Sequence, residues 1–142
     1  MNYEDTLANA IDALADEETA KAEKMLNQMI EAAKSGLNGT AADAEHYYAW
    51  GRGLRLLEEP EQALLRLEQV LGLESEHEGA LWEMASIFLH DLDRAEAASE
   101  ILEKRLLPLR QDEELYQEAL DSARFRLRLA KNPPAPPEDA EP

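Results

Sequence analysis

The stretch YYAWGRGLRLLEEP, residues 47–60, decides the fold expected for this chain. Its apolar residues recur at helical spacing, yet it holds two glycines before a proline ends the helix. A glycine inside a helix costs about 1 kcal/mol relative to alanine. We therefore expect Gly51 to mark a close approach of the next helix, with Ala63 as the small residue there. Gly53 lies off that face, and alanine there is expected to be neutral or mildly stabilising if the position faces solvent.

The composition predicts an all-α protein of one domain. The chain has 142 residues, the size of an ordinary domain. The helix formers Ala, Leu, Glu, Gln, Lys, Arg and Met dominate, while Val and Thr are scarce. Strands are not expected.

The charge and the absence of cysteine exclude several functions. Thirty-one acidic residues against fourteen basic ones give a net charge of −17, which repels phosphate backbones and anionic membranes. Neither nucleic acid nor a membrane is expected as a partner. Without cysteine there is no disulfide, thiolate metal site or cysteine nucleophile. The N-terminus lacks a basic start and an apolar run, so we expect no signal peptide and a cytoplasmic protein.

Apolar spacing predicts seven helices. The first two and the last carry apolar stripes on one face, namely Tyr3, Leu7, Ile11 and Leu14, then Ala22, Leu26, Met29, Ile30 and Ala33, and finally Tyr116, Ala119, Ala123, Leu127 and Ala130. The third helix is expected at about 41–57, and the fourth from Pro60 to Leu71 with Gly72 as its stop. The fifth is expected from the region of Ser75 through Leu89, and the sixth from the region of Asp93 to Pro108. Residues 132–142 are proline-rich and acidic and are expected to form a disordered tail.

Short polar patterns predict where four of these helices begin. Three pairs have capping-box spacing, and Asp112 is expected to cap the last helix; the pairs are Thr40 with Asp43, Ser75 with Glu78, and Asp93 with Glu96.

The sequence also repeats itself. A shift of 35 residues carries large positions onto large ones and small onto small: Tyr47 onto Trp82, Trp50 onto Ala85, Gly51 onto Ser86, Leu54 onto Leu89 and Ala63 onto Ala98. A shift of 34 then carries Trp82 onto Tyr116. Periods of this length are typical of solenoids built from helix pairs.

These residues resemble the tetratricopeptide repeat (TPR) family, whose repeats carry an aromatic, a leucine and a glycine on the first helix and a small residue on the second. Ser86 in place of glycine, Ser75 where proline is common, and a third copy without a second helix depart from the pattern. The resemblance implies a right-handed α-solenoid of antiparallel helix pairs over residues 1–131. Its divisions would be a divergent pair at 1–34, repeats at 44–78 and 79–112, and a capping helix at 113–131.

In that family the first helices line a concave groove that binds a peptide or a helix of another protein. Carried onto this chain, the resemblance places in the groove Tyr48, Arg52, Arg55, Glu83, Ile87, His90, Gln117, Asp121 and Arg124. Arg52 and Arg55 could hold a C-terminal carboxylate. The alternative is that Arg55 pairs with Glu59 and Arg52 with Glu83, exposed links worth about 0.5 kcal/mol each.

The chain offers no constellation for catalysis. Its three histidines are not paired at a ligand spacing, and HEGAL at residues 77–81 lacks the second histidine of a zinc protease motif. No catalytic residue, cofactor or metal is expected, and the protein is interpreted as a non-enzyme adaptor. The alternatives are a small acidic chaperone of the secretion type and a self-associating scaffold. Phe125 and Leu129 are expected to form a docking patch for a partner or, in weak self-association, for a second copy of the chain. Alternatively, helix seven folds back over helix six and covers them.

Overall fold

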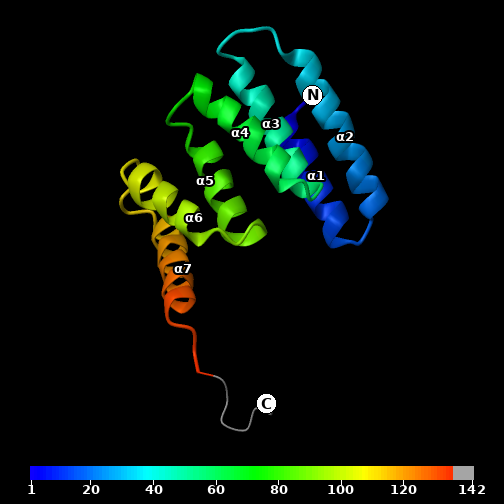
Figure 1. The fold of residues 1–142 in the computed structure, drawn as a ribbon. Coiled ribbons are helices and arrows are strands. Elements are labelled where there is room, and N and C mark those ends of the chain that lie inside the picture. The colour runs from blue at the N-terminus through cyan, green and yellow to red at the C-terminus, as the bar shows by residue number, and fades with distance from the viewer. Residues whose placement is uncertain (136–142) are drawn as a thin grey trace.

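The structure is a computed structural model that describes residues 1–135, and these residues form helices with no strand (Figure 1). The seven helices are α1 (Tyr3–Ala15), α2 (Thr19–Gly36), α3 (Asp43–Leu56), α4 (Pro60–Leu73), α5 (Glu78–Ser86), α6 (Ala95–Ile101) and α7 (Glu114–Lys131). Two π-helical segments extend α5 and α6, namely η1 (Ile87–Asp91) and η2 (Leu102–Leu106). The predicted all-α class and helix number are confirmed. Most of the predicted tail at 132–142 lies outside the described residues.

Each helix packs on the next helix in the chain. The contacts run from α1 to α2, on to α3 and α4, and through α5 and α6 to α7. Figure 1 shows this progression from blue α1 and α2 at one side to orange α7 at the other end. The chain therefore forms a row of helices, in which the inner helices are covered on more sides than the two outermost.

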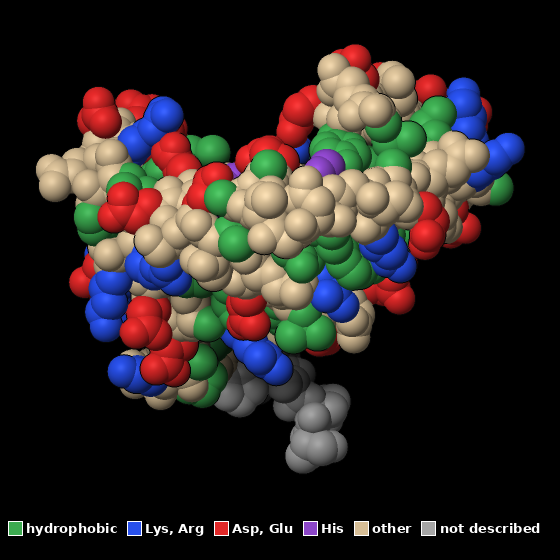
Figure 2. Space-filling model, turned by 90° about the horizontal axis from the view of Figure 1, so that it is seen from above, with side chains coloured by type: hydrophobic (Ala, Val, Ile, Leu, Met, Phe, Trp, Pro, Cys, Tyr) green, Lys and Arg blue, Asp and Glu red, His purple; other side chains and the backbone are tan. Residues whose placement is uncertain are grey.

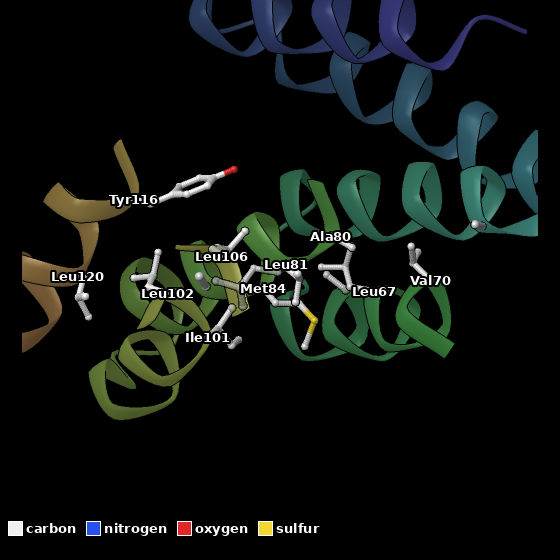
Figure 3. Packing of buried hydrophobic residues seen from close by; sticks show 14 residues of the cluster. Leu67, Val70, Ala80, Leu81, Met84, Ile101, Leu102, Leu106, Tyr116 and Leu120 are labelled. Carbon is white, nitrogen blue, oxygen red and sulfur yellow. The ribbon is translucent and has the colours of Figure 1, made fainter. Parts of the chain in front are cut away.

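The largest apolar cluster extends from Ala44 of α3 through α4, α5 with η1, and α6 with η2 to α7. Figure 3 shows Leu81 and Met84 of α5 between Leu67 of α4 on one side and Leu102 and Leu106 of η2 on the other, with Tyr116 toward one end. A second cluster joins the first three helices through Leu7, Ala10, Leu26, Met29 and Ala49. The stripe predicted for α2 is buried throughout: Ala22, Leu26, Met29, Ile30 and Ala33.

Two apolar residues of the outer helices were wrongly placed in the core. Ile11 is 48% exposed, and α1 instead buries Ala10 and Ala13 beside Leu7. Ala130 is exposed, because it lies in the last turn of α7, beyond the three residues that this helix buries: Tyr116, Leu120 and Ala123.

The surface mixes both signs of charge. Figure 2 shows red acidic and blue basic side chains interspersed over one face, with apolar atoms between them. With a net charge of −17, long-range repulsion from other anionic surfaces acts on the whole molecule.

Gly51 lies where α4 packs against α3. A Cβ atom added at Gly51 would lie 3.0 Å from Cγ of Leu67 and 3.3 Å from the carbonyl oxygen of Ala63. Both Leu67 and Ala63 are fully buried. The missing side chain therefore allows the close helix approach expected from the sequence.

Gly53 is also buried, which contradicts the expectation that it faces solvent. A Cβ atom there would lie 2.9 Å from Cε of Met29 and 3.1 Å from Cγ1 of Ile30. The two glycines thus serve opposite sides of α3, because Gly51 admits α4 and Gly53 admits α2.

Gly53→Ala should therefore destabilise the protein by about 1 kcal/mol, because crowding of Met29 and Ile30 outweighs the gain in helix propensity. Gly72→Ala is the matched control, since Gly72 is an exposed helical glycine with no atom within 4 Å of an added Cβ. It should raise stability by up to about 1 kcal/mol. Urea unfolding of both variants measures the difference, and equal effects would contradict the packing of Gly53.

The helix starts differ from the predicted capping boxes. His77 caps α5, since its Nδ1 accepts the Ala80 N–H at 3.0 Å, and Ser75 lies outside that cap. Asp93 has a left-handed backbone with φ of 51°, so it does not cap α6, which begins after Arg94. Glu113 rather than Asp112 caps α7. Gly72 does not stop α4, which continues to Leu73.

Asp43 also departs from its predicted role. Its carboxylate reaches back into the loop before α3 and accepts the N–H groups of Asn38 at 3.0 Å and Gly39 at 2.8 Å. Asp43 is only 5% exposed. It therefore fixes the connection between α2 and α3 rather than completing a capping box with Thr40.

Candidate functional site

Two adjoining cavities form a hollow on the side of α3 that faces α1 and α5. One has a volume of about 210 Å³ and the other about 580 Å³. Both are lined by Arg55 and Leu56, so they meet at these two residues. We call them together the α3 hollow, lined by Leu7, Ile11, Arg52, Arg55, Leu56, Glu58, Pro60, Glu83 and Asp91.

An ion-pair network crosses this hollow. Arg55 contacts Asp91 of η1 through Nε and Oδ2 at 2.9 Å, and Glu83 of α5 through Nη1 and Oε2 at 3.0 Å. Arg52 contacts Glu4 of α1 through Nη1 and Oε1 at 2.6 Å. Its Nε lies 3.8 Å from Oε1 of Glu83. The network thus links α1, α3, α5 and η1.

Of the two ion pairs given as the alternative, the one between Arg55 and Glu59 was wrong, and the one between Arg52 and Glu83 is confirmed. Arg55 bonds Asp91 and Glu83, and not the neighbouring Glu59, while Arg52 does approach Glu83. Burial alone would lower the pKa of the Arg55 guanidinium, but its hydrogen bonds to Asp91 and Glu83 raise the pKa above the ordinary value. Arg55 therefore stays charged throughout the physiological pH range.

The network disfavours the carboxylate clamp. The two guanidiniums of Arg52 and Arg55 already face three carboxylates, those of Glu4, Glu83 and Asp91. An incoming carboxylate would have to displace one of these partners against a locally negative surface. The hollow is electrostatically better matched to a cationic segment.

Tyr48 packs against Arg52 of this network. The Arg52 guanidinium carbon lies 4.9 Å from the centre of the Tyr48 ring, a cation–π contact. The Tyr48 ring also lies beside His77, with ring centres 4.7 Å apart. Burial raises the pKa of Tyr48 above its usual value, so the phenol stays neutral. Tyr48 is thus a packed support and not a free acid or base.

Ile11 and Leu56 supply the apolar floor of the hollow. Ile11 is 48% exposed, and sequence reasoning missed it as a site residue because it belongs to the apolar stripe assigned to the core. The better signal was the spacing of Leu7, Ala10 and Ala13, which defines the buried face of α1 and leaves Ile11 beside it.

The other residues expected in the groove do not join this hollow. Ile87 is fully buried, because α5 and η1 lie within the row and the core cluster surrounds it. His90 is exposed but lines neither cavity. On α7, Gln117 donates to Asp121 at 3.0 Å, and Arg124 pairs with Glu103 of η2 at 3.2 Å. The structure brings together Tyr48, Arg52, Arg55 and Glu83, and it leaves Ile87, His90, Gln117, Asp121 and Arg124 apart.

The aromatic positions of the repeat pattern lie between helices. Trp50 of α3 is flanked by Arg66 of α4, 4.0 Å from a ring centre, and by Lys34 of α2 at 5.1 Å. Trp82 of α5 lies 5.4 Å from Tyr116 of α7 between ring centres. Burial and the nearby Glu78 raise the pKa of Tyr116 to about 12. These rings therefore tie helices together.

The remaining positions of the repeat pattern are packed to different degrees. Gly51, Ala63, Ala85, Leu89 and Ala98 are buried, whereas Tyr47 and Leu54 are partly covered.

Residues 1–135 hold no cluster of three or more His, Asp or Glu side chains that could bind a metal ion. Over the same span, no helix combines the length and the apolar character needed to cross a membrane.

In comparisons with family models, curated proteins and solved structures, no match to this chain is found. The resemblance to the TPR family therefore rests on the residues of this chain alone.

Proposed function

We propose that this protein is a non-catalytic interaction module that binds a peptide or a helix of another protein in the α3 hollow. The observation that carries the proposal is the pair of adjoining cavities, about 210 and 580 Å³, with an exposed isoleucine on the apolar floor. An apolar floor beside fixed charges is a common design of peptide-binding surfaces.

The chemistry of the hollow suggests the kind of segment it binds. Ile11 and Leu56 offer an apolar seat, and Glu4, Glu83 and Asp91 outnumber the two arginines. A segment with an aliphatic or aromatic side chain flanked by lysine or arginine would satisfy both features. The net charge of −17 would also speed its approach.

A TPR-like solenoid of antiparallel helix pairs is the architecture we propose for this module. Its support is the repeated pattern together with two small residues at equivalent positions, Ala63 and Ala98, that are both fully buried. The close contact at Gly51 supports the same pairing of α3 with α4. A cytoplasmic location fits this role and remains part of the proposal.

Ile11→Asp tests the hollow, because it places a charge on the apolar floor. Capture of partner proteins on immobilised protein should fall at least about tenfold, since burying one aliphatic side chain contributes about 1.5–3 kcal/mol. Leu65→Asp is the matched control: Leu65 has the same 48% exposure and lines neither cavity. Quantitative mass spectrometry of the captured proteins gives the readout, and thermal melting checks that both variants fold.

Equal loss of partners from both variants, or no loss from Ile11→Asp, would contradict binding in the hollow. The set of proteins captured by the wild type also separates the alternatives. One secreted client would favour a secretion-type chaperone, while several unrelated proteins would favour a general adaptor. Capture of this chain alone would favour a scaffold.

A further inference from the structure

The outer side of α7 carries a second apolar stripe, separate from its buried one. Leu115, Phe125 and Leu129 are 50%, 54% and 40% exposed. Together with Glu118 and Ser122 they are spaced alternately three and four residues apart, the spacing of a helix that pairs with another helix. We call these five residues the α7 seam. No helix follows α7 within residues 1–135, so the described chain supplies no element to cover the seam.

The charges along α7 change sign from one end of the helix to the other. Its first half carries Glu114, Glu118 and Asp121, and its second half carries Arg124, Arg126, Arg128 and Lys131. Arg124 and Arg126 are engaged by Glu103, Asp93 and the Leu89 carbonyl oxygen. Arg128 instead lies over the Phe125 ring at 6.0 Å and has no carboxylate partner among the described residues, and the same holds for Glu114 with respect to cations.

We propose that a second copy of this chain packs on the α7 seam, with the two α7 helices antiparallel and related by a twofold axis near Ser122. In this arrangement Leu115 lies opposite the partner's Leu129, because the two positions are equally far from Ser122 in sequence. Glu114 and the partner's Arg128 are offset by only two residues in this register, about 3 Å along the helix axis, which their long side chains span. Each dimer therefore contains two such ion pairs and two such leucine contacts.

The charge pattern selects the antiparallel direction. A parallel pair would bring the basic second halves of the two helices together, and likewise the two acidic first halves, which is repulsive. Ser122 is small enough for the two helices to approach at the centre. With three large apolar side chains per copy, the contact suits a dimer of micromolar affinity and not an obligate one.

Sedimentation equilibrium of the full chain at up to about 100 μM tests this dimer, a range that brackets micromolar dissociation constants. Phe125→Asp with Leu129→Asp should weaken dimerisation more than about 100-fold, because it removes two apolar contacts per copy and introduces charge. Leu65→Asp is the control and should leave the dissociation constant unchanged, since Leu65 belongs to α4 and its exposure of 48% lies between those of Phe125 and Leu129.

A charge exchange gives a sharper test. Glu114→Arg alone and Arg128→Glu alone should each weaken the dimer by about tenfold, because each change sets two like-charged pairs against each other. The two changes in one chain should restore the wild-type affinity, since Arg at position 114 then faces Glu at position 128 of the partner. Failure of the double variant to recover would overturn the proposed register.

Cysteine cross-linking reports the direction of the helices, and the absence of native cysteine keeps the background clean. Ser122→Cys should form disulfide-linked dimers on mild oxidation. Leu115→Cys mixed with Leu129→Cys should cross-link, whereas either variant alone should not. Self-linking of Leu129→Cys would indicate parallel helices and overturn the proposal.

A monomeric wild-type chain at the highest concentration would also overturn the proposal. If, in addition, the Phe125 and Leu129 substitutions lowered the melting temperature, the seam would be covered by another part of the same chain. These outcomes do not depend on partner binding in the α3 hollow, so failure here leaves the proposed function untouched.

Discussion

Replacing Gly51 with leucine is expected to lower the free energy of unfolding by about 3 kcal/mol, because it overpacks the close contact between α3 and α4. The added Cβ would lie 3.0 Å from Cγ of Leu67, which is fully buried and cannot move into solvent. Ala63 closes the other side with its backbone carbonyl oxygen at 3.3 Å. Urea unfolding followed by circular dichroism measures the loss, and a variant as stable as the wild type would contradict this contact.

The Gly51 contact can also be tested by compensation. Leu67→Ala alone should cost about 2–5 kcal/mol, because it leaves a cavity between α3 and α4. When it is combined with Gly51→Leu, the new leucine can occupy part of that space. The double variant should therefore be more stable than the sum of the single effects predicts, by at least about 1 kcal/mol. Strict additivity would show that the two side chains do not share space.

Asp43→Ala is expected to lower the free energy of unfolding by about 2 kcal/mol. The carboxylate of Asp43 accepts two backbone N–H groups, from Asn38 and Gly39, in a part-buried loop. Its removal leaves both donors without their acceptor, and such a group costs about 1–3 kcal/mol. Urea unfolding at neutral pH gives the measurement.

Two further variants test whether the loss at Asp43 comes from its hydrogen bonds to the loop. Asp43→Asn should recover part of the loss, because the amide oxygen can still accept one of the two N–H groups. Asp12→Ala is the matched control on an exposed turn of α1 and should change stability by less than about 0.5 kcal/mol. A loss at Asp12 as large as that at Asp43 would mean that removal of a surface charge, and not the loop bonds, accounts for the effect.

Helix positions could be predicted from the sequence because they depend on a signal spread over many residues. The apolar stripe of α2 repeats over several turns, and each of its five residues is buried. Pro60 begins α4 as predicted, since proline suits the first turn of a helix. Errors at single positions do not disturb a periodicity of this length.

The helix caps could not be predicted because a capping pattern is short and many loops match it. Ser75 with Glu78 has the spacing of a capping box, yet the residue that caps α5 is His77, whose ring nitrogen accepts the Ala80 N–H. Asp93 has a suitable side chain for a cap, but its backbone is left-handed and the residue that precedes α6 is Arg94. Local hydrogen bonds of these side chains compete with the helix start, and a pattern of four residues does not determine which conformation has the lower free energy.

The residues that α3 contributes beside the α3 hollow could be predicted from the sequence, but those from other helices could not. Tyr48, Arg52 and Arg55 share one face of a single helix, which spacing determines. Ile87 was placed with them by its spacing from Glu83, but its burial depends on how many helices surround η1. The burial of Gly53 likewise depends on the approach of Met29 from α2. Periodicity within one helix contains no information about how closely a second helix lies.

The packing of each helix on its neighbour in sequence has a consequence for folding kinetics. Contacts between adjacent helices require only short loops to close, so little chain entropy is lost before they form. Chains with such local contacts fold within microseconds to milliseconds. Trp50, between Lys34 and Arg66, and Trp82, beside Tyr116, lie at different helix junctions. Their fluorescence can therefore time the ordering of two separate parts of the row during refolding.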